Sequence, residues 1–195
     1  MAKQIISIGY KIPGIQTYSF ISSQSLLDSD VIVFSPELPY SSRDPFQGKT
    51  TYDESTSFHI KDATSHWHQE LTTALTSGKT VFVFWKQYEK FYVQTGNKRT
   101  EGTGRTAQIY NIVDIFDNYH FLPLQTPEMI SSTGNKIKFI HHPAFVTFWN
   151  EYKEFLGFES YFNEPIEKPL FVTTTGDKVI GGLFALGQGH LVILP

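Results

Sequence analysis

The chain has 195 residues, a formal net charge of −3 and no cysteine. Its length suits one domain with a buried core, and its near-neutral charge argues against a general nucleic-acid binder. The absence of cysteine excludes disulfide bonds, thiolate metal sites and a cysteine nucleophile, and it fits a reducing, cytoplasmic location. Because no apolar run reaches the roughly 18 residues of a membrane span, we expect no membrane insertion.

The pattern of the first half of the chain predicts short buried strands around one helix. Residues 4–10, 30–34 and 80–85 are apolar and rich in β-branched side chains, as in strands of a parallel sheet. Apolar side chains at helical spacing predict a helix over residues 62–77, with Asp62 as its N-cap. Strand, helix and strand in this order indicate a βαβ unit. The polar segment 39–58 predicts a long connecting loop, either a lid or a partner contact.

The second half begins with an aromatic-rich helix, expected over residues 143–156. Its aromatic stripe indicates packing on a sheet, with an aromatic ligand platform as the alternative. Four strands are expected after it as an antiparallel meander, at residues 158–162, 170–174, 179–185 and 190–194. No linker divides the chain, so we expect a single domain over residues 1–195. The final LVILP is a buried-type strand, which predicts that this is the N-terminal domain of a longer protein.

Three segments carry a resemblance to a known family: LLDSDVIVF, ELTTALTSGKTVFVFW and VTTTGDKVIGGLFALGQGHLVIL. Their order resembles the class I glutamine-amidotransferase-like fold, a relative of flavodoxin. The resemblance implies an α/β fold with a mainly parallel flavodoxin-like sheet flanked by helices and a C-terminal antiparallel β-meander. Catalytic members carry a cysteine on a sharp turn after a central strand, where this chain has Lys86, Gln87 and Tyr88. Glutaminase chemistry is therefore excluded, and the resemblance implies a non-catalytic binding, oligomerisation or regulatory domain.

A second resemblance rests on SPELPYSS, SHWHQELTTAL and GKTVFVF, which are similar to the later half of a TIR domain. In NAD-cleaving TIR domains the glutamate of the corresponding helix is catalytic, and by position it matches Glu70 in this sequence. The resemblance implies a nucleotide hydrolase that uses Glu70, with Ser35 and Trp67 lining its site.

The carboxyl ends of the expected parallel strands are one candidate ligand site. Ser35 and Glu37 follow the apolar segment 30–34, where a carboxylate can accept hydrogen bonds from ribose hydroxyls or act as a base. The alternative is a proline turn with a solvated Glu37.

The segment TGNKRTEGTGRT, residues 95–106, is the densest basic stretch of the chain. Small residues let backbone N–H groups approach an anion, and arginine binds phosphate or carboxylate with two hydrogen bonds. The segment therefore predicts contact with an anionic small molecule or an acidic protein surface. The alternative is a β-hairpin tip between residues 91–95 and 108–113. The candidate contact residues are Gly96, Lys98, Arg99, Gly102, Gly104 and Arg105.

No motif in the sequence dictates a metal site or a cofactor, and we expect neither. His66 and Glu70 are spaced to share one helix face, but a metal site needs a third ligand. The leading hypothesis is a non-catalytic ligand- or protein-binding α/β domain. The alternatives are the TIR-like hydrolase that uses Glu70 and a structural oligomerisation domain, which predicts a homo-oligomer.

Overall fold

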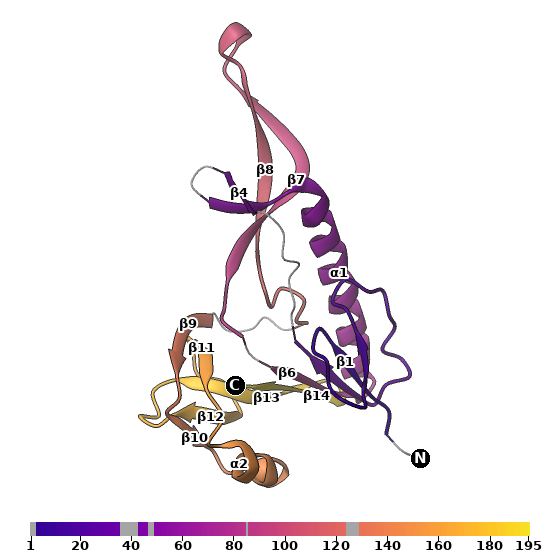
Figure 1. Ribbon diagram of the computed structural model, residues 1–195, viewed down its shortest axis with the longest axis vertical. Helices are drawn as coiled ribbons and strands as arrows, with labels where there is room; N and C mark the ends of the chain where they lie inside the picture. The colour runs from indigo at the N-terminus through magenta and orange to yellow at the C-terminus, as the bar shows by residue number, and fades with distance from the viewer. Residues whose placement is uncertain (1–2, 36–42, 47–48, 85, 124–128) are drawn as a thin grey trace.

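The computed structural model describes residues 3–35, 43–46, 49–84, 86–123 and 129–195 (Figure 1). One large mixed sheet forms the body, and a long helix runs from it to a second, smaller sheet. A two-stranded hairpin of that second sheet extends far beyond the rest of the molecule.

Five strands of the large sheet are parallel. Their order is β2-β1-β3-β6-β14, and every neighbouring pair in this row is parallel. The strands are β1 (Ile5–Ile8), β2 (Gln16–Tyr18), β3 (Val31–Phe34), β6 (Thr80–Phe84) and β14 (Gly189–Leu194). The strand β14 thus lies between β6 and β13, and its apolar sequence follows from this central position.

The rest of the large sheet is antiparallel. Beyond β14 the order continues through β13, β12 and β10, and β11 joins β13 to β9. The strands are β9 (Met129–Gly134), β10 (Ile137–Phe139), β11 (Phe158–Phe162), β12 (Pro169–Thr173) and β13 (Val179–Leu186). The expected antiparallel C-terminal strands are confirmed. The expectation of a mainly parallel sheet is wrong, because the sheet is mixed.

The long helix α1 spans Glu54–Thr76 and begins eight residues before the predicted start. Its N-cap is Asp53, whose carboxylate accepts a hydrogen bond from the Thr56 N–H at 2.9 Å. The expected cap, Asp62, is instead an exposed residue inside the helix. The first two turns are polar, with few apolar residues at helical spacing, so sequence periodicity does not reveal them.

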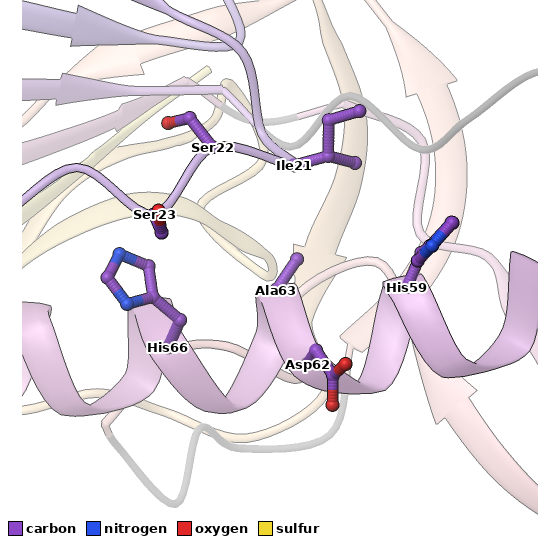
Figure 2. A pocket seen from close by; sticks show the side chains of 7 residues that line it. All are labelled: Ile21, Ser22, Ser23, His59, Asp62, Ala63 and His66. Carbon is purple, nitrogen blue, oxygen red and sulfur yellow. The ribbon is translucent and has the colours of Figure 1, made fainter.

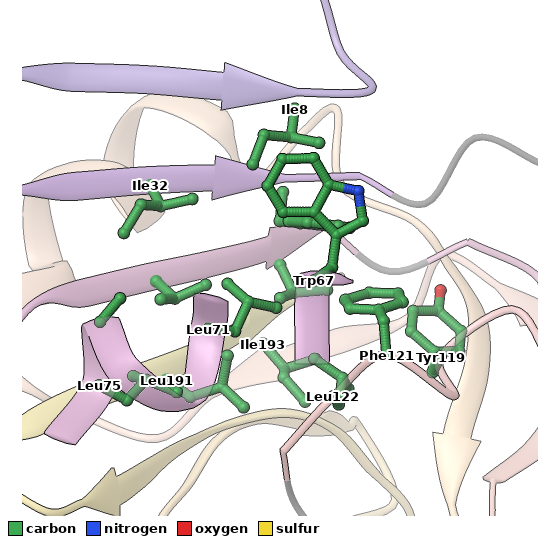
Figure 3. Close-up of a cluster of buried hydrophobic side chains, with 14 of the residues drawn as sticks. Ile8, Ile32, Trp67, Leu71, Leu75, Tyr119, Phe121, Leu122, Leu191 and Ile193 are labelled. Carbon is green, nitrogen blue, oxygen red and sulfur yellow. The ribbon is translucent and has the colours of Figure 1, made fainter. Parts of the chain in front are cut away.

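The main core lies between α1 and one face of the large sheet (Figure 3). Trp67 of α1 is fully buried, with its ring 5.6 Å from that of Phe34 at the end of β3. The indole N–H donates to the Phe20 carbonyl oxygen at 2.5 Å. The ring of Phe121 stacks on Phe34 at 4.3 Å, so the segment after the second sheet also closes this core.

The opposite face of the sheet is covered by a short helical segment. A 3-10 turn, η2 (Pro143–Phe145), leads into α2 (Val146–Tyr152), which is shorter than the predicted helix over residues 143–156. Phe148 and Trp149 of α2 pack against Phe171 of β12. This part of the aromatic stripe therefore docks the helix on the sheet, while Tyr152 and Phe155 are exposed.

The second sheet has the order β4-β5-β7-β8. Its strands are β4 (Arg43–Phe46), β5 (Lys49–Tyr52), β7 (Lys90–Glu101) and β8 (Gln108–Asp117). The predicted loop over residues 39–58 thus contains two strands and the start of α1, while residues 36–42 and 47–48 of this region lie outside the described chain. We call the β7–β8 hairpin, residues 90–117, the arm.

Candidate functional site

At the carboxyl edge of the parallel strands, Ser35 is buried and hydrogen-bonded rather than open to a ligand. This residue is 1% exposed, and its N–H donates to the Ile8 carbonyl oxygen at 2.9 Å. Ser35 thus extends the pairing of β1 with β3 by one residue. The second residue predicted for this edge, Glu37, lies outside the described residues.

The segment that leaves β6, residues 86–89, is held by side chains from other elements. The Tyr119 hydroxyl accepts a hydrogen bond from the Lys86 N–H at 2.5 Å and donates to the Lys86 carbonyl oxygen at 2.9 Å. Asn118 acts in the same way, because its amide oxygen accepts from the Glu89 N–H and its amide nitrogen donates to the Gln87 carbonyl oxygen. Two consecutive residues thus fix both ends of the segment.

Strand β11 supplies the remaining acceptors of this segment. The Glu159 carboxylate accepts from the Gln87 N–H at 2.8 Å, and the Ser160 hydroxyl oxygen accepts from the Tyr88 N–H at 2.7 Å. Every backbone N–H from residue 86 to residue 89 is therefore bound by a side chain. In hydrolases with a nucleophile at such a strand end, free N–H groups stabilise the oxyanion. Here those donors are already occupied.

Tyr119 is buried, and burial raises the pKa of its hydroxyl above the ordinary value for tyrosine, against a smaller lowering by the hydrogen bond with Lys86. The neutral hydroxyl can both donate and accept, as the Lys86 contact requires. Sequence reasoning missed Asn118, Tyr119, Glu159 and Ser160, because they lie 29 or more positions from their partners and form no local motif.

Glu70 fixes the loop between β2 and β3 to helix α1. Its carboxylate accepts a hydrogen bond from the Leu26 N–H at 2.7 Å and one from the Ser25 hydroxyl at 3.2 Å. Lys79 binds the same loop, donating to the carbonyl oxygens of Leu26 and Ser29 at 3.2 and 2.6 Å. The structure therefore places Glu70 beside this loop, and Trp67 in the core rather than at an open surface.

A cavity of about 350 Å³ opens between α1 and residues 21–23 (Figure 2). His59, Asp62 and His66 of α1 line its lower side. The Ser22 hydroxyl is buried there without a hydrogen-bond partner among the described residues. In Figure 2, however, His66 points towards Ser23 whereas Asp62 points away from that loop. The polar groups thus do not converge on one point.

A second cavity, of about 370 Å³, lies between α1 and the end of β8. His68 of α1 and His120 line it, and the His120 ring stacks on Phe116 at 4.3 Å. No three histidine, aspartate or glutamate side chains within the described ranges come together as ligands of a metal ion.

The arm carries the predicted contact residues on its outer half, where Gly96, Lys98 and Arg99 lie in β7 and the other three lie in the tip. Strand pairing runs from Lys90 opposite Asp117 to Glu101 opposite Gln108, and it is interrupted by a bulge between Gln94 and Lys98. Only residues 102–107, which include the 3-10 turn η1 (Gly104–Thr106), form the tip.

Two of the predicted glycines have a clear structural requirement. Gly96, at the bulge, has φ +79°, and a Cβ there would lie 2.9 Å from the Phe58 ring of α1. Gly102, at the tip, has φ +87°, and a Cβ there would lie 2.7 Å from the Thr106 carbonyl oxygen. Gly104 belongs to the same turn. These glycines shape the arm, so their presence does not by itself indicate a ligand.

The three predicted cations of the arm differ in their surroundings. Arg99 forms an ion pair with Glu101 at 3.0 Å, and its guanidinium lies 5.9 Å from the Tyr110 ring centre. Lys98 and Arg105 are exposed, and neither has an ion-pair partner among the residues that the structure describes. The structure thus brings all three cations to one end of the arm, with two of them unpaired there.

The base of the arm is packed firmly. Phe91 and Val93 of β7 are buried with Tyr52 of β5 and Ile60 of α1. The Gln94 N–H donates to the buried Ser57 hydroxyl at 2.9 Å, and Lys61 forms an ion pair with Asp114 at 3.3 Å. These contacts attach the base of the arm to α1 and β5.

Comparison with known proteins returned no match: no family model, no curated protein and no solved structure is similar to this chain at a significant level. Within the described ranges, no helix combines the length and apolar character required to cross a membrane.

Proposed function

We propose that this protein is a non-catalytic binding domain that contacts an acidic partner through the arm. One observation carries the proposal: a hairpin fixed at its base extends beyond the body and presents Lys98 and Arg105 without ion-pair partners among the described residues (Figure 1). Exposed cations at the end of a projecting ribbon meet an approaching partner first and attract acidic surfaces.

The body of the protein supports a scaffolding role. The order β2-β1-β3-β6-β14 corresponds to the 2-1-3-4-5 order of flavodoxin-like sheets, in which ligands bind at the carboxyl edge beside the first strand. At this edge Ser35 is buried and the N–H groups of residues 86–89 are bound by side chains. The arm is therefore the better candidate for a contact surface.

Binding to a labelled oligoglutamate peptide, followed by fluorescence anisotropy, tests the proposal. We expect binding that weakens with added salt, and a roughly 2–10-fold rise in Kd for the double variant Lys98→Ala/Arg105→Ala. A matched control is Lys136→Ala/Lys138→Ala, which removes two exposed cations from the large sheet. No binding by the wild-type protein, or equal losses in both double variants, would contradict the proposal.

A TIR-like hydrolase that uses Glu70 stays a prediction from the sequence. Nicotinamide release from NAD, measured for the wild-type protein and for Glu70→Gln, tests it directly. If the wild-type protein releases nicotinamide and Glu70→Gln does not, the leading function becomes that of an enzyme rather than of a binding domain.

A further inference from the structure

The outer edge of β8 has no strand beside it among the described residues, where β8 pairs only with β7. Residues 96–109 are exposed, so beyond the contact between Gly96 and Phe58 this half of the arm is a two-stranded ribbon on which no other described element packs. An isolated two-stranded ribbon is marginally stable, and an open edge strand is a template for another strand. The arm therefore has the properties of a surface that is completed by a partner.

The hydrogen bonds of β8 show which of its backbone groups face outward. The Ile112 carbonyl oxygen accepts from the Thr95 hydroxyl at 2.9 Å, and the Asn118 N–H donates to the Glu89 carbonyl oxygen at 3.2 Å. Even-numbered positions of the strand therefore direct their backbone towards β7, and the positions between them direct it outward. From Ile109 to Ile115, the outward positions are Ile109, Asn111, Val113 and Ile115.

Three exposed isoleucines are spaced evenly along the same strand. Ile109, Ile112 and Ile115 are 69%, 39% and 58% exposed. Because side chains alternate along a strand, Ile109 and Ile115 share one face, and Ile112 lies on the other. The strand is thus symmetric about Ile112 in both its isoleucines and its outward backbone groups.

We propose that β8 pairs antiparallel with β8 of a second copy of this chain, about a two-fold axis at Ile112. The proposal rests on the proposed function, since it names the partner of the arm. In this register Ile109 faces Ile115 of the second copy, and Ile112 faces its own counterpart. The four outward positions meet as hydrogen-bonded pairs that exchange about two bonds each. Every exposed isoleucine of the strand is then covered.

Charge favours the same arrangement. Antiparallel pairing places the tip of each arm beside the base of the other, so that Ala107 faces Asp117. The basic tip residue Arg105 then lies near Asp117, the acidic residue at the end of β8. A two-fold axis at Asp114 would instead set two carboxylates opposite each other, which is destabilising. The base of the second arm is the acidic surface that the proposed function requires.

Because the chain has no cysteine, single cysteines test the register directly. Ile112→Cys faces itself in a non-hydrogen-bonded pair, where Cα atoms are about 4.5 Å apart and a disulfide can form. We expect a covalent dimer on mild oxidation of Ile112→Cys. Ile109→Cys alone should give little covalent dimer. A mixture of Ile109→Cys and Ile115→Cys should cross-link as a heterodimer. Ser65→Cys, at an exposed position of α1, is the matched control and should stay monomeric under the same oxidation.

Light scattering and sedimentation of the unmodified protein measure its oligomeric state independently. We expect a mass of twice 22.3 kDa, and at least a tenfold rise in dimer Kd for Ile109→Lys/Ile115→Lys. The control Leu27→Lys, at another exposed apolar residue, should leave the dimer unchanged. A wild-type monomer at all concentrations, or cross-linking of Ser65→Cys as efficient as that of Ile112→Cys, would overturn the proposal. Oligoglutamate binding is measured in the same samples. Binding by a protein that stays monomeric would overturn the dimer alone, whereas loss of binding would contradict the proposed function.

Discussion

The Tyr119 hydroxyl binds both backbone groups of Lys86, accepting from the N–H at 2.5 Å and donating to the carbonyl oxygen at 2.9 Å. One buried side chain thereby binds the backbone of Lys86, the first described residue after β6, as a neighbouring strand would. The contact fixes the point at which the chain leaves the large sheet and turns towards the arm. Its loss should affect both the stability of the body and the placement of the arm.

Tyr119→Phe should lower the free energy of unfolding by about 1–3 kcal/mol, because the Lys86 N–H loses its acceptor and the Lys86 carbonyl oxygen keeps only the longer bond from the Ser160 hydroxyl at 3.3 Å. Urea unfolding measures the loss. Tyr110→Phe, which removes a hydroxyl from the exposed arm, is the control and should change stability by less than about 0.5 kcal/mol. Similar values for the two variants would show that the Tyr119 contact contributes little.

Alkaline pH should destabilise the protein through the same residue. Burial raises the Tyr119 pKa above its ordinary value of about 10, so the unfolded chain loses this proton at a lower pH than the folded chain does. The stabilisation is complete below about pH 10 and declines as pH rises further. Unfolding measured across this range should show a steeper decline for the wild-type protein than for Tyr119→Phe. Parallel curves would exclude the effect.

The N-cap of α1 should contribute to stability above pH 4. Hydrogen bonds from the Thr56 N–H and hydroxyl lower the pKa of Asp53, so its stabilisation is present above the unfolded pKa of about 4 and is lost as pH falls through the folded value. Asp53→Ala should cost about 1 kcal/mol at neutral pH, measured by urea unfolding. Asp53→Asn keeps a capping oxygen and should retain most of the stability while losing the acid dependence. A full loss in Asp53→Asn would contradict this account.

Glu70 should act mainly on the loop that it holds. Glu70→Ala leaves the Leu26 N–H without its acceptor and should cost about 1–3 kcal/mol in unfolding experiments. Glu70→Gln keeps an acceptor oxygen and should cost less. Amide hydrogen exchange at Leu26 provides a local readout, with faster exchange expected in Glu70→Ala. Unchanged exchange would show that the loop is held without this carboxylate.

Gly189 should tolerate no side chain. A Cβ there would lie 2.4 Å from the Leu75 carbonyl oxygen in α1 and 2.5 Å from that of Lys79, just before β6, and both are backbone atoms. Gly189→Ala should therefore cost about 1–3 kcal/mol or more, seen as a drop in Tm of several degrees. Gly157→Ala is the control, because its Cβ would approach the nearest backbone oxygen only to 3.4 Å. A similar small effect in both would indicate that α1 can move away from β14.

Strands with continuous apolar sequence were predictable from the chain alone. The elements β3, β6 and β11–β14 lie within a residue or two of the expected ranges, because burial on a sheet leaves a local apolar pattern. The start of α1 was missed, since Asp53 caps a polar first turn whose buried members include Ser57. The parallel pairing of β14 with β6 was also missed, because a pairing partner more than 100 positions away leaves no local pattern.

The candidate site was only partly predictable. The basic residues of the arm stand out by composition, and the structure exposes Lys98 and Arg99 on β7 and Arg105 in the tip, while their role as contact residues stays a prediction. The side chains that bind residues 86–89 could not be predicted, because each acts through a contact that exists only after the sheets are assembled. The spacing of the isoleucines on β8 gains meaning only once β8 is known to be an edge strand.

The central position of β14 has a consequence for biosynthesis. Strands β6 and β13 are made before β14, and neither has its full set of neighbours until residues 189–194 have left the ribosome. The nascent chain therefore carries two apolar strand edges that stay unpaired until residues 189–194 are made. Folding of the large sheet should then be completed only after residues 189–194 have been synthesised, and until then the unpaired edges are apolar surfaces that chaperones can bind.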